Sequence, residues 1–290
     1  MPLTGVFTVG LSGGLGNQMF QYALGRNLAL RHRAELLLDT RQVDADANRS
    51  FALAAHDIAA PVATSSQLPA PLGRIQRRLI RWSRGKLATR YLVERTFEFD
   101  AAALERRPPA HLSGNWQSER YFRDCRETLR NEFQLVAPFS PARQRMAALI
   151  DDVNAVSVHV RRGDYVSNPV ANAYHGTCEP AWYDRAKAAI ENLVSNPRYF
   201  VFSDDPQWAK DNLTSFASAV FVAAADDGQD AQDLHLMARC RHHIIANSSF
   251  SWWGAWLNPR PDKVVVAPRN WFRGGAHDTR DLLPKGWNRL

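Results

Sequence analysis

The segment that begins at His159 carries the residues of this chain best suited to bind an anion. It follows the apolar run Val156-Ser157-Val158 and continues into Arg161 and Arg162. An arginine stays charged at any working pH and presents a planar fork of donors that matches phosphate oxygens. Because side chains alternate along a strand, we expect His159 and Arg161 to share one face, with Arg162 on the other. Arg161 would then face a ligand and Arg162 would fix the loop. A simpler alternative is an Arg–Asp pair, with Asp164 as the acid, that closes the turn.

A second candidate for anion binding is the polar segment Asn247-Ser248-Ser249-Phe250-Ser251. It lies between an apolar run and a helical pattern. Hydroxyls and backbone N–H groups at a strand-to-helix turn suit a phosphate. A polar cap on the helix that begins near Trp252 explains the segment equally well.

Acidic residues supply two further candidates. Asp233 lies in the first turn of a predicted helix, where its carboxylate could accept the N1–H and the exocyclic amine of a guanine. In that position an aspartate more often serves only as a partner of the helix dipole. Asp204 and Asp205 resemble metal ligands, but no third ligand is evident near them and Pro206 indicates that Asp205 caps a helix. We therefore expect no metal.

The N-terminal loop 11–17 has the glycines of a phosphate-binding turn. Gly14 and Gly16 would let the backbone approach a ligand closely, and the helix that follows would point its N–H groups at the same place. The dinucleotide fingerprint needs a third glycine where Met19 stands, which disfavours a nicotinamide site. Asn17 is placed either to orient a hydroxylated substrate or to cap the helix.

Composition and charge restrict the classes of protein and partner. The chain has 290 residues, of which 45% are apolar, and this is enough for two domains with substantial cores. Its net charge of +7 is compatible with nucleic acid, an anionic membrane face or a phosphorylated small ligand. The three cysteines are too few and too widely spaced for a disulfide framework or a zinc site, which fits a reducing compartment. Without a signal peptide or an apolar run of roughly 20 residues, we expect a cytoplasmic protein.

The first part of the chain combines a regular beginning with an irregular continuation. Strand 6–9, helix 18–33 and strand 35–39 form a predicted βαβ unit. The segment 44–110 is irregular and basic. Its residues 72–86 predict a helix with an apolar face ringed by arginines, which indicates either contact with a membrane surface through Arg74 to Arg90 or a helix docked on its own domain.

From about residue 150, strands alternate with helices. The expected strands are 155–160, 199–202, 220–224, 243–246 and 263–267, and the expected helices are 180–194, 206–212, 230–240 and 252–257. This alternation predicts a parallel sheet with helices on both faces, which binds ligands at the carboxyl ends of its strands. Each motif described above lies at such an end. We therefore predict an α/β protein with two Rossmann-like domains, 1–150 and 151–290, that face a cleft.

Four motifs carry a resemblance to a known family. They are Gly13–Tyr22, His159–Tyr165, Phe202–Asp205 and Asn247–Gly254, in this order. The chain resembles the bacterial α-1,2-fucosyltransferases of glycosyltransferase family 11 from about residue 8 to Trp287, with a weaker likeness between 44 and 110.

The resemblance implies a function and a set of site residues. It implies a GT-B-like fold, GDP-fucose as donor, a terminal galactose as acceptor, inversion at the anomeric carbon, and neither metal nor cofactor. The N-terminal domain would be the acceptor side and the C-terminal domain would bind GDP-fucose. His159 and Arg161 would meet the nucleotide sugar, Asp233 the guanine, and Ser248 and Ser249 the diphosphate, while Asn17 would lie near the sugar. The expected catalytic residues are Arg161, Asn17 and Arg162, and the expected donor-binding residues are Gly14, Gly16, His159, Arg161, Asp233, Asn247, Ser248, Ser249 and Phe250.

The chemistry of transfer agrees with this assignment. Cleavage of the bond between fucose and GDP builds charge on the β-phosphate, and a preorganised donor such as Arg161 contributes about 3 kcal/mol to its stabilisation. The sequence indicates no general base. A nicotinamide-dependent oxidoreductase and a non-catalytic nucleic-acid binder are the alternatives, but neither explains the twin-arginine and Asn-Ser-Ser-Phe motifs together. The expected product is a surface polysaccharide such as an O-antigen, built on a lipid carrier at the inner face of the cytoplasmic membrane.

Overall fold

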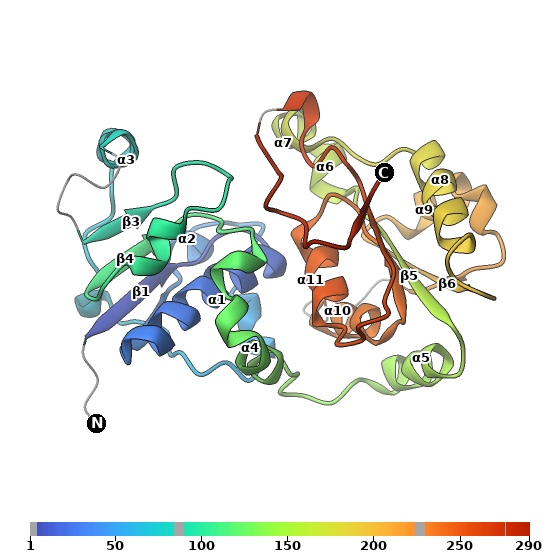
Figure 1. Ribbon diagram of the computed structural model, residues 1–290, viewed down its shortest axis with the longest axis horizontal. Helices are drawn as coiled ribbons and strands as arrows, with labels where there is room; N and C mark the ends of the chain where they lie inside the picture. The colour runs from blue at the N-terminus through green and yellow to red at the C-terminus, as the bar shows by residue number, and fades with distance from the viewer. Residues whose placement is uncertain (1–4, 84–89, 224–229, 276) are drawn as a thin grey trace. The chain divides into compact units, whose positions relative to one another are not determined.

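The chain forms two compact units. The computed structural model describes residues 5–83, 90–223, 230–275 and 277–290. Unit 1 comprises Met1–Val136 and Asp278–Pro284, and unit 2 comprises Ala137–His277 and Lys285–Leu290. The first division falls after Val136 and not near 150, because helix α5 (Pro141–Asp151) buries Ala147 and Ile150 against α10 (Asp230–Arg239) of unit 2. Both helices are labelled in Figure 1.

Unit 1 is built on a four-stranded parallel sheet. Its strand order is β2-β1-β4-β3, with β1 at Val6–Gly10, β2 at Glu35–Asp39, β3 at Tyr91–Val93 and β4 at Ala110–Ser113. Helix α1 (Leu15–His32) connects β1 to β2, so the predicted βαβ unit is confirmed. The other helices of the unit are α2 (Arg41–Asp44), α3 (Arg74–Trp82), α4 (Arg126–Glu132) and the one-turn 3₁₀ helices Ala52–Ala55, Ser65–Gln67, Ala101–Glu105, Glu119–Tyr121 and Arg123–Cys125.

The segment 44–110, expected to be irregular, contributes an edge strand and an exposed helix. Strand β3 has only three residues, too few for a recognisable alternation. Helix α3 carries its apolar side chains in solvent: Ile75 is 77% exposed, Leu79 52% and Trp82 83%. Helix α3 does contact β3 of its own unit, but not through Ile75, Leu79 and Trp82, so the expected docking on its own domain with a solvated charged face is not observed in that form. The rest of the predicted basic segment, residues 84–89, lies outside the described residues. No helix of the described ranges has the length and apolarity needed to cross a bilayer.

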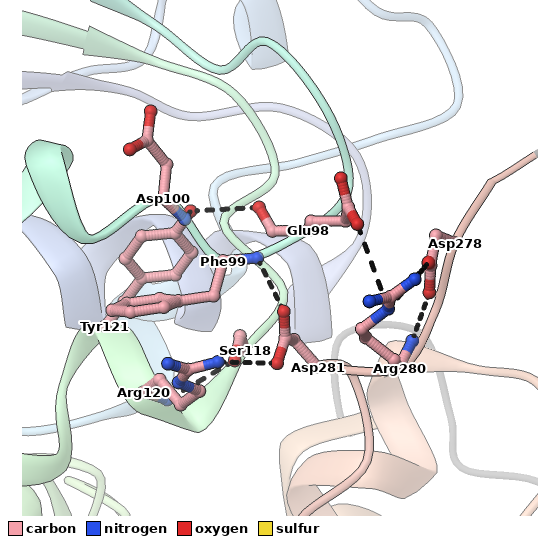
Figure 2. Close-up of polar contacts among 9 residues, drawn as sticks. All are labelled: Glu98, Phe99, Asp100, Ser118, Arg120, Tyr121, Asp278, Arg280 and Asp281. Carbon is pink, nitrogen blue, oxygen red and sulfur yellow. Dashed lines mark hydrogen bonds and ion pairs between the residues drawn. The ribbon is translucent and has the colours of Figure 1, made fainter.

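The short C-terminal segment Asp278–Pro284 returns to unit 1. Asp281 accepts a hydrogen bond from the backbone N–H of Phe99 (3.1 Å) and forms an ion pair with Arg120 (2.6 Å), as Figure 2 shows. The Arg120 guanidinium also lies 4.0 Å from the centre of the Phe99 ring. The chain therefore passes between the two units three times, and a single boundary does not separate them.

Unit 2 is built on a six-stranded parallel sheet. Its strand order is β10-β9-β8-β5-β6-β7, with β5 at Ala155–Val160, β6 at Arg198–Ser203, β7 at Val220–Phe221, β8 at His242–Ile244, β9 at Val265–Ala267 and β10 at Asn288–Arg289. Its other helices are α6 (Gly163–Ser167), α7 (Pro169–His175), α8 (Pro180–Glu191), α9 (Pro206–Asn212), α11 (Ser249–Leu257) and the 3₁₀ turns Thr214–Phe216 and Arg273–Gly275. The predicted alternation of strands and helices is confirmed. Residue 224, the end of the predicted third strand, lies outside the described residues.

Apolar cores cover both faces of this sheet. Val156, Val158 and Val160 pack on one face with Trp182 of α8, and Phe200 and Phe202 pack on the other. All six residues of β5 are buried although Ser157 and His159 are polar, and its four apolar residues were enough to predict the strand with its observed bounds. Polar side chains follow the carboxyl ends of β5, β6 and β8.

Candidate functional site

Two aspartates hold the twin arginines at the carboxyl ends of β5 and β6. The parallel register pairs Val160 with Ser203, so the residues that follow each strand meet. Arg161 Nη1 lies 2.8 Å from Asp204 Oδ2, and the backbone N–H of Arg162 donates to Asp204 Oδ1 (2.8 Å). A Cβ on Gly163 would lie 2.6 Å from Asp204 Oδ2, so a larger residue there would displace this carboxylate. Asp204 thus fixes both the loop and the guanidinium of Arg161.

Arg162 is engaged by a different set of partners. Its Nε lies 3.2 Å from Asp205 Oδ2, and its guanidinium stacks 3.8 Å from the centre of the Trp208 ring. Asp205 also accepts the Trp208 N–H (3.1 Å), so the predicted cap of α9 is confirmed. Both arginines follow the last residue of β5, so strand alternation does not separate them as expected. Their partners are Asp204 and Asp205; the side chain of Asp164 lies outside the described residues.

Sequence reasoning missed the role of these two aspartates. It considered them as metal ligands or as a cap, although an acid pair after a neighbouring strand is a signal for partners of Arg161 and Arg162. Within the described ranges, no three His, Cys, Asp or Glu side chains gather as a metal-binding group.

His159 is a buried, neutral imidazole with an unused nitrogen. The residue is 5% exposed, and burial, with the nearby charge of Arg161, lowers its pKa to about 3. Its ring lies 5.5 Å from that of Phe250, in the first turn of α11. Among the described residues, no group forms a hydrogen bond with its Nδ1. Buried polar atoms are nearly always paired, so this nitrogen is available to contact a ligand.

Helix α11 begins at the carboxyl end of β8 with unused backbone donors. Ser248 is its N-cap residue, but its side chain makes no capping hydrogen bond. The N–H groups of Ser249, Phe250 and Ser251 have no acceptor within an α-helix and point out of its N-terminus. This arrangement suits an anion.

Asn247 positions the loops around this helix. Its side-chain amide lies within 3.0–3.3 Å of the backbone oxygens of His175, Gly176 and Trp271. With its N–H groups directed at these carbonyls, Asn247 holds the wall of a cavity of about 610 Å³ that Arg273 also lines. The expected contact of Asn247 with a ligand is not tested by this geometry.

Asp233 forms a buried ion pair. Its Oδ1 lies 2.8 Å from Arg143 Nε, although the N–H is not aligned for a hydrogen bond. Burial raises the pKa of Asp233 to about 6, and the charge of Arg143 opposes this shift. Asp233 is therefore ionised at neutral pH, as recognition of guanine would require.

The glycine-rich loop lies in unit 1. Gly14 is the N-cap residue of α1, so Asn17 does not cap this helix. The Asn17 Oδ1 accepts instead from Gln117 Nε2 (2.8 Å). Gly13 has φ 72°, and a Cβ there would lie 2.6 Å from Asn17 Nδ2. Gly14, Gly16 and Asn17 thus belong to one unit, whereas the other predicted site residues belong to the second.

Comparisons with known proteins give a consistent picture. The model of glycosyl transferase family 11 matches residues 1–290. The chain is 33% identical to an alpha-1,2-colitosyltransferase of Escherichia coli over an alignment of 286 residues. This alignment covers 97% of each of the two chains. It is 32% identical to the O-antigen biosynthesis glycosyltransferase WbnK of Escherichia coli, over 91% of this chain and 94% of that protein. The crystal structure of the fucosyltransferase NodZ from Bradyrhizobium superposes with a TM-score of 0.53 at 18% identity, over 88% of this chain and 93% of that chain. This likeness confirms the predicted GT-B-like fold.

Proposed function

Because the chain belongs to glycosyl transferase family 11, we propose that it transfers L-fucose from GDP-fucose to the 2-hydroxyl of a galactose-terminated glycan. The proposed transfer inverts the anomeric carbon and uses no metal. The observation that carries the proposal is the anion-binding arrangement of unit 2, in which Asp204 orients Arg161 and His159 keeps an unpaired nitrogen. A nicotinamide-dependent oxidoreductase and a nucleic-acid binder do not agree with the family.

The proposed reaction is a displacement at the anomeric carbon. The bond from C1 of fucose to the β-phosphate oxygen breaks, and its electron pair leaves with GDP. O2 of galactose forms the new bond from the opposite face, and its proton passes to solvent water. Negative charge grows on the departing diphosphate, where Arg161 and the N–H groups that begin α11 stabilise it. Because Asp204 already holds the Arg161 side chain, less reorganisation is needed in the transition state.

Further residues bind and orient the donor in this proposal. Asp233, ionised at neutral pH, accepts the N1–H and the amine of guanine. The neutral His159 contacts the nucleotide sugar. Gly14 and Gly16 permit close approach of the loop, and Asn17, held by Gln117, lies near the sugar.

The acceptor is proposed to be a lipid-linked precursor of a surface polysaccharide, fucosylated in the cytoplasm at the inner face of the cytoplasmic membrane. Helix α3 supports the membrane part of this proposal, since Ile75, Leu79 and Trp82 expose an apolar face with Arg74 and Arg78 beside it. An exposed apolar face flanked by arginines suits the interface of an anionic bilayer.

Release of the nucleoside diphosphate, GDP or UDP, from different donors tests the proposed activity. We would supply GDP-fucose, GDP-colitose and UDP-galactose in turn, with a panel of galactose-terminated and glucose-terminated disaccharides. We expect release that depends on both GDP-fucose and a terminal galactose. Release from GDP-colitose alone would move the proposal to the sugar of the relative from Escherichia coli, and no transfer from any GDP-sugar would overturn it.

A further inference from the structure

Unit 1 contains a pocket of about 570 Å³ at the carboxyl ends of all four strands of its sheet. Gly10 ends β1, Asp39 ends β2, Glu94 follows β3, and Ser113 ends β4; all four line the pocket. In parallel α/β sheets this edge is where ligands bind. None of the residues assigned to the donor lines this pocket, so it is available for a second substrate.

The charges in this pocket do not cancel. Three arginines and two carboxylates line it. Asp39 is committed to Arg41 through two contacts, Oδ1 to Nε (2.9 Å) and Oδ2 to Nη2 (2.8 Å). Glu94 binds the loop after β4, because its carboxylate accepts hydrogen bonds from the backbone N–H groups of Asn115 (2.7 Å) and Trp116 (2.9 Å). His111 adds no charge at neutral pH, since burial lowers its pKa to about 4.

Helix α3 supplies the other two arginines. Arg77 and Arg81 line the pocket one helical turn apart. Neither is within ion-pair distance of an acid among the described residues, although the charge of Arg81 opposes the rise that burial causes in the pKa of Glu94. At 100° per residue, they lie opposite to Ile75 and Trp82 on the helix. The same helix thus presents two guanidinium groups to the pocket and an apolar face to solvent.

We propose that this pocket holds the acceptor glycan and that Arg77 and Arg81 select acceptors with an anionic group beside the terminal galactose. The inference rests on the proposed function and names the substrate class that the function leaves open. The anionic group is a carboxylate or a phosphate. An acidic sugar supplies the first and the diphosphate of a lipid carrier the second. Both are planar or tetrahedral oxyanions that a guanidinium binds through paired hydrogen bonds.

Direct binding to the full chain tests the inference without turnover. The probes are three soluble disaccharides. The first is the neutral methyl glycoside of galactosyl-β-1,3-N-acetylgalactosamine, the second is the same disaccharide with an alkyl diphosphate at its reducing end, and the third is the methyl glycoside of galactosyl-β-1,3-glucuronic acid. Dissociation constants are measured by titration calorimetry for the wild type and for two double variants. The double variant Arg77→Gln with Arg81→Gln removes two positive charges from the pocket lining. Arg74→Gln with Arg78→Gln is the matched control, since it removes the same charge from the same helix outside the pocket lining.

We expect an anionic probe to bind about tenfold more tightly than the neutral probe, as two partly exposed ion pairs would give. The advantage should persist in the control, vanish in the pocket variant and shrink at high salt. A preference for the glucuronic acid identifies an acidic sugar, and one for the diphosphate identifies the lipid carrier. Equal binding of neutral and anionic probes, or an advantage that survives in the pocket variant, would overturn the inference. Anionic preference without fucosyl transfer would refute only the proposed function, and transfer without such preference would refute only the inference.

Discussion

The twin arginines should fail in different ways when each is replaced by lysine. Arg161 is oriented by Asp204 and is proposed to face the donor diphosphate, whereas Arg162 is stacked on Trp208 and paired with Asp205. Lysine keeps the charge in both variants but loses the planar fork. Arg161→Lys should therefore reduce turnover, and Arg162→Lys should reduce stability.

The expected losses of stability and of kcat can be calculated from these contacts. Arg162→Lys loses the stacking on Trp208, about 0.5–1 kcal/mol, and weakens a partly buried ion pair by roughly 0.2–1 kcal/mol. The sum of about 1–2 kcal/mol corresponds to a Tm lower by roughly 3–6 °C for a unit of this size. Arg161→Lys loses a preorganised donor to the departing diphosphate, about 3 kcal/mol, so kcat should fall by roughly a hundredfold or more with little change in Tm.

The assay compares kcat for GDP-fucose transfer with the Tm from differential scanning fluorimetry. Arg198→Lys is the control, because Arg198 is exposed at the opposite end of β6. We expect wild-type values for this control. Near-total loss of turnover in both Arg161→Lys and Arg162→Lys at unchanged Tm would refute the division of roles, and an active Arg161→Lys enzyme would refute the proposed stabilisation of the diphosphate.

Three further predictions concern metal, membrane and pH. Transfer should continue in excess EDTA, because the proposed stabilisation of the diphosphate uses Arg161 and backbone N–H groups; loss of activity that Mg²⁺ or Mn²⁺ restores would contradict this. Ile75→Ser with Trp82→Ser should weaken sedimentation with anionic vesicles at low salt and leave transfer to a soluble acceptor intact, whereas Val170→Ser, at a site 79% exposed in unit 2, should change neither. Affinity for GDP-fucose, whose diphosphate does not titrate in this range, should rise as pH rises through about 6, because the pKa of Asp233 is raised to about 6 and only its ionised form accepts both guanine donors. Asp233→Asn should bind GDP-fucose more weakly with a flat profile over this range, and an equally pH-dependent Asn variant would exclude Asp233 as the cause.

Local patterns in the sequence predicted much of unit 2. The four apolar residues among the six of β5 gave its bounds, and the order Asp205-Pro206 gave the start of α9. The pairing of Arg161 with Asp204 had no such local signal. It depends on the register between β5 and β6, which brings together residues 43 positions apart, and a single sequence does not specify which strands pair.

Unit 1 was predicted less completely because its important features are short or distant in the chain. Glu94 follows a strand of three residues, and the pocket it lines combines the ends of four strands with Arg77 and Arg81 of α3. The return of Asp281 to unit 1 rests on Arg120 and Phe99, more than 160 residues earlier. Contacts of this kind leave no periodic pattern.

The linkage of the product tests the central claim most directly. The enzyme would be supplied with GDP-β-L-fucose and a galactose-terminated disaccharide, and the purified trisaccharide would be assigned by two-dimensional ¹H–¹³C NMR. We predict an α-configured fucose whose anomeric proton correlates with C2 of galactose. A β-configured fucose, or an α-fucose attached to any other galactose carbon, would contradict the proposed inverting transfer to the 2-hydroxyl.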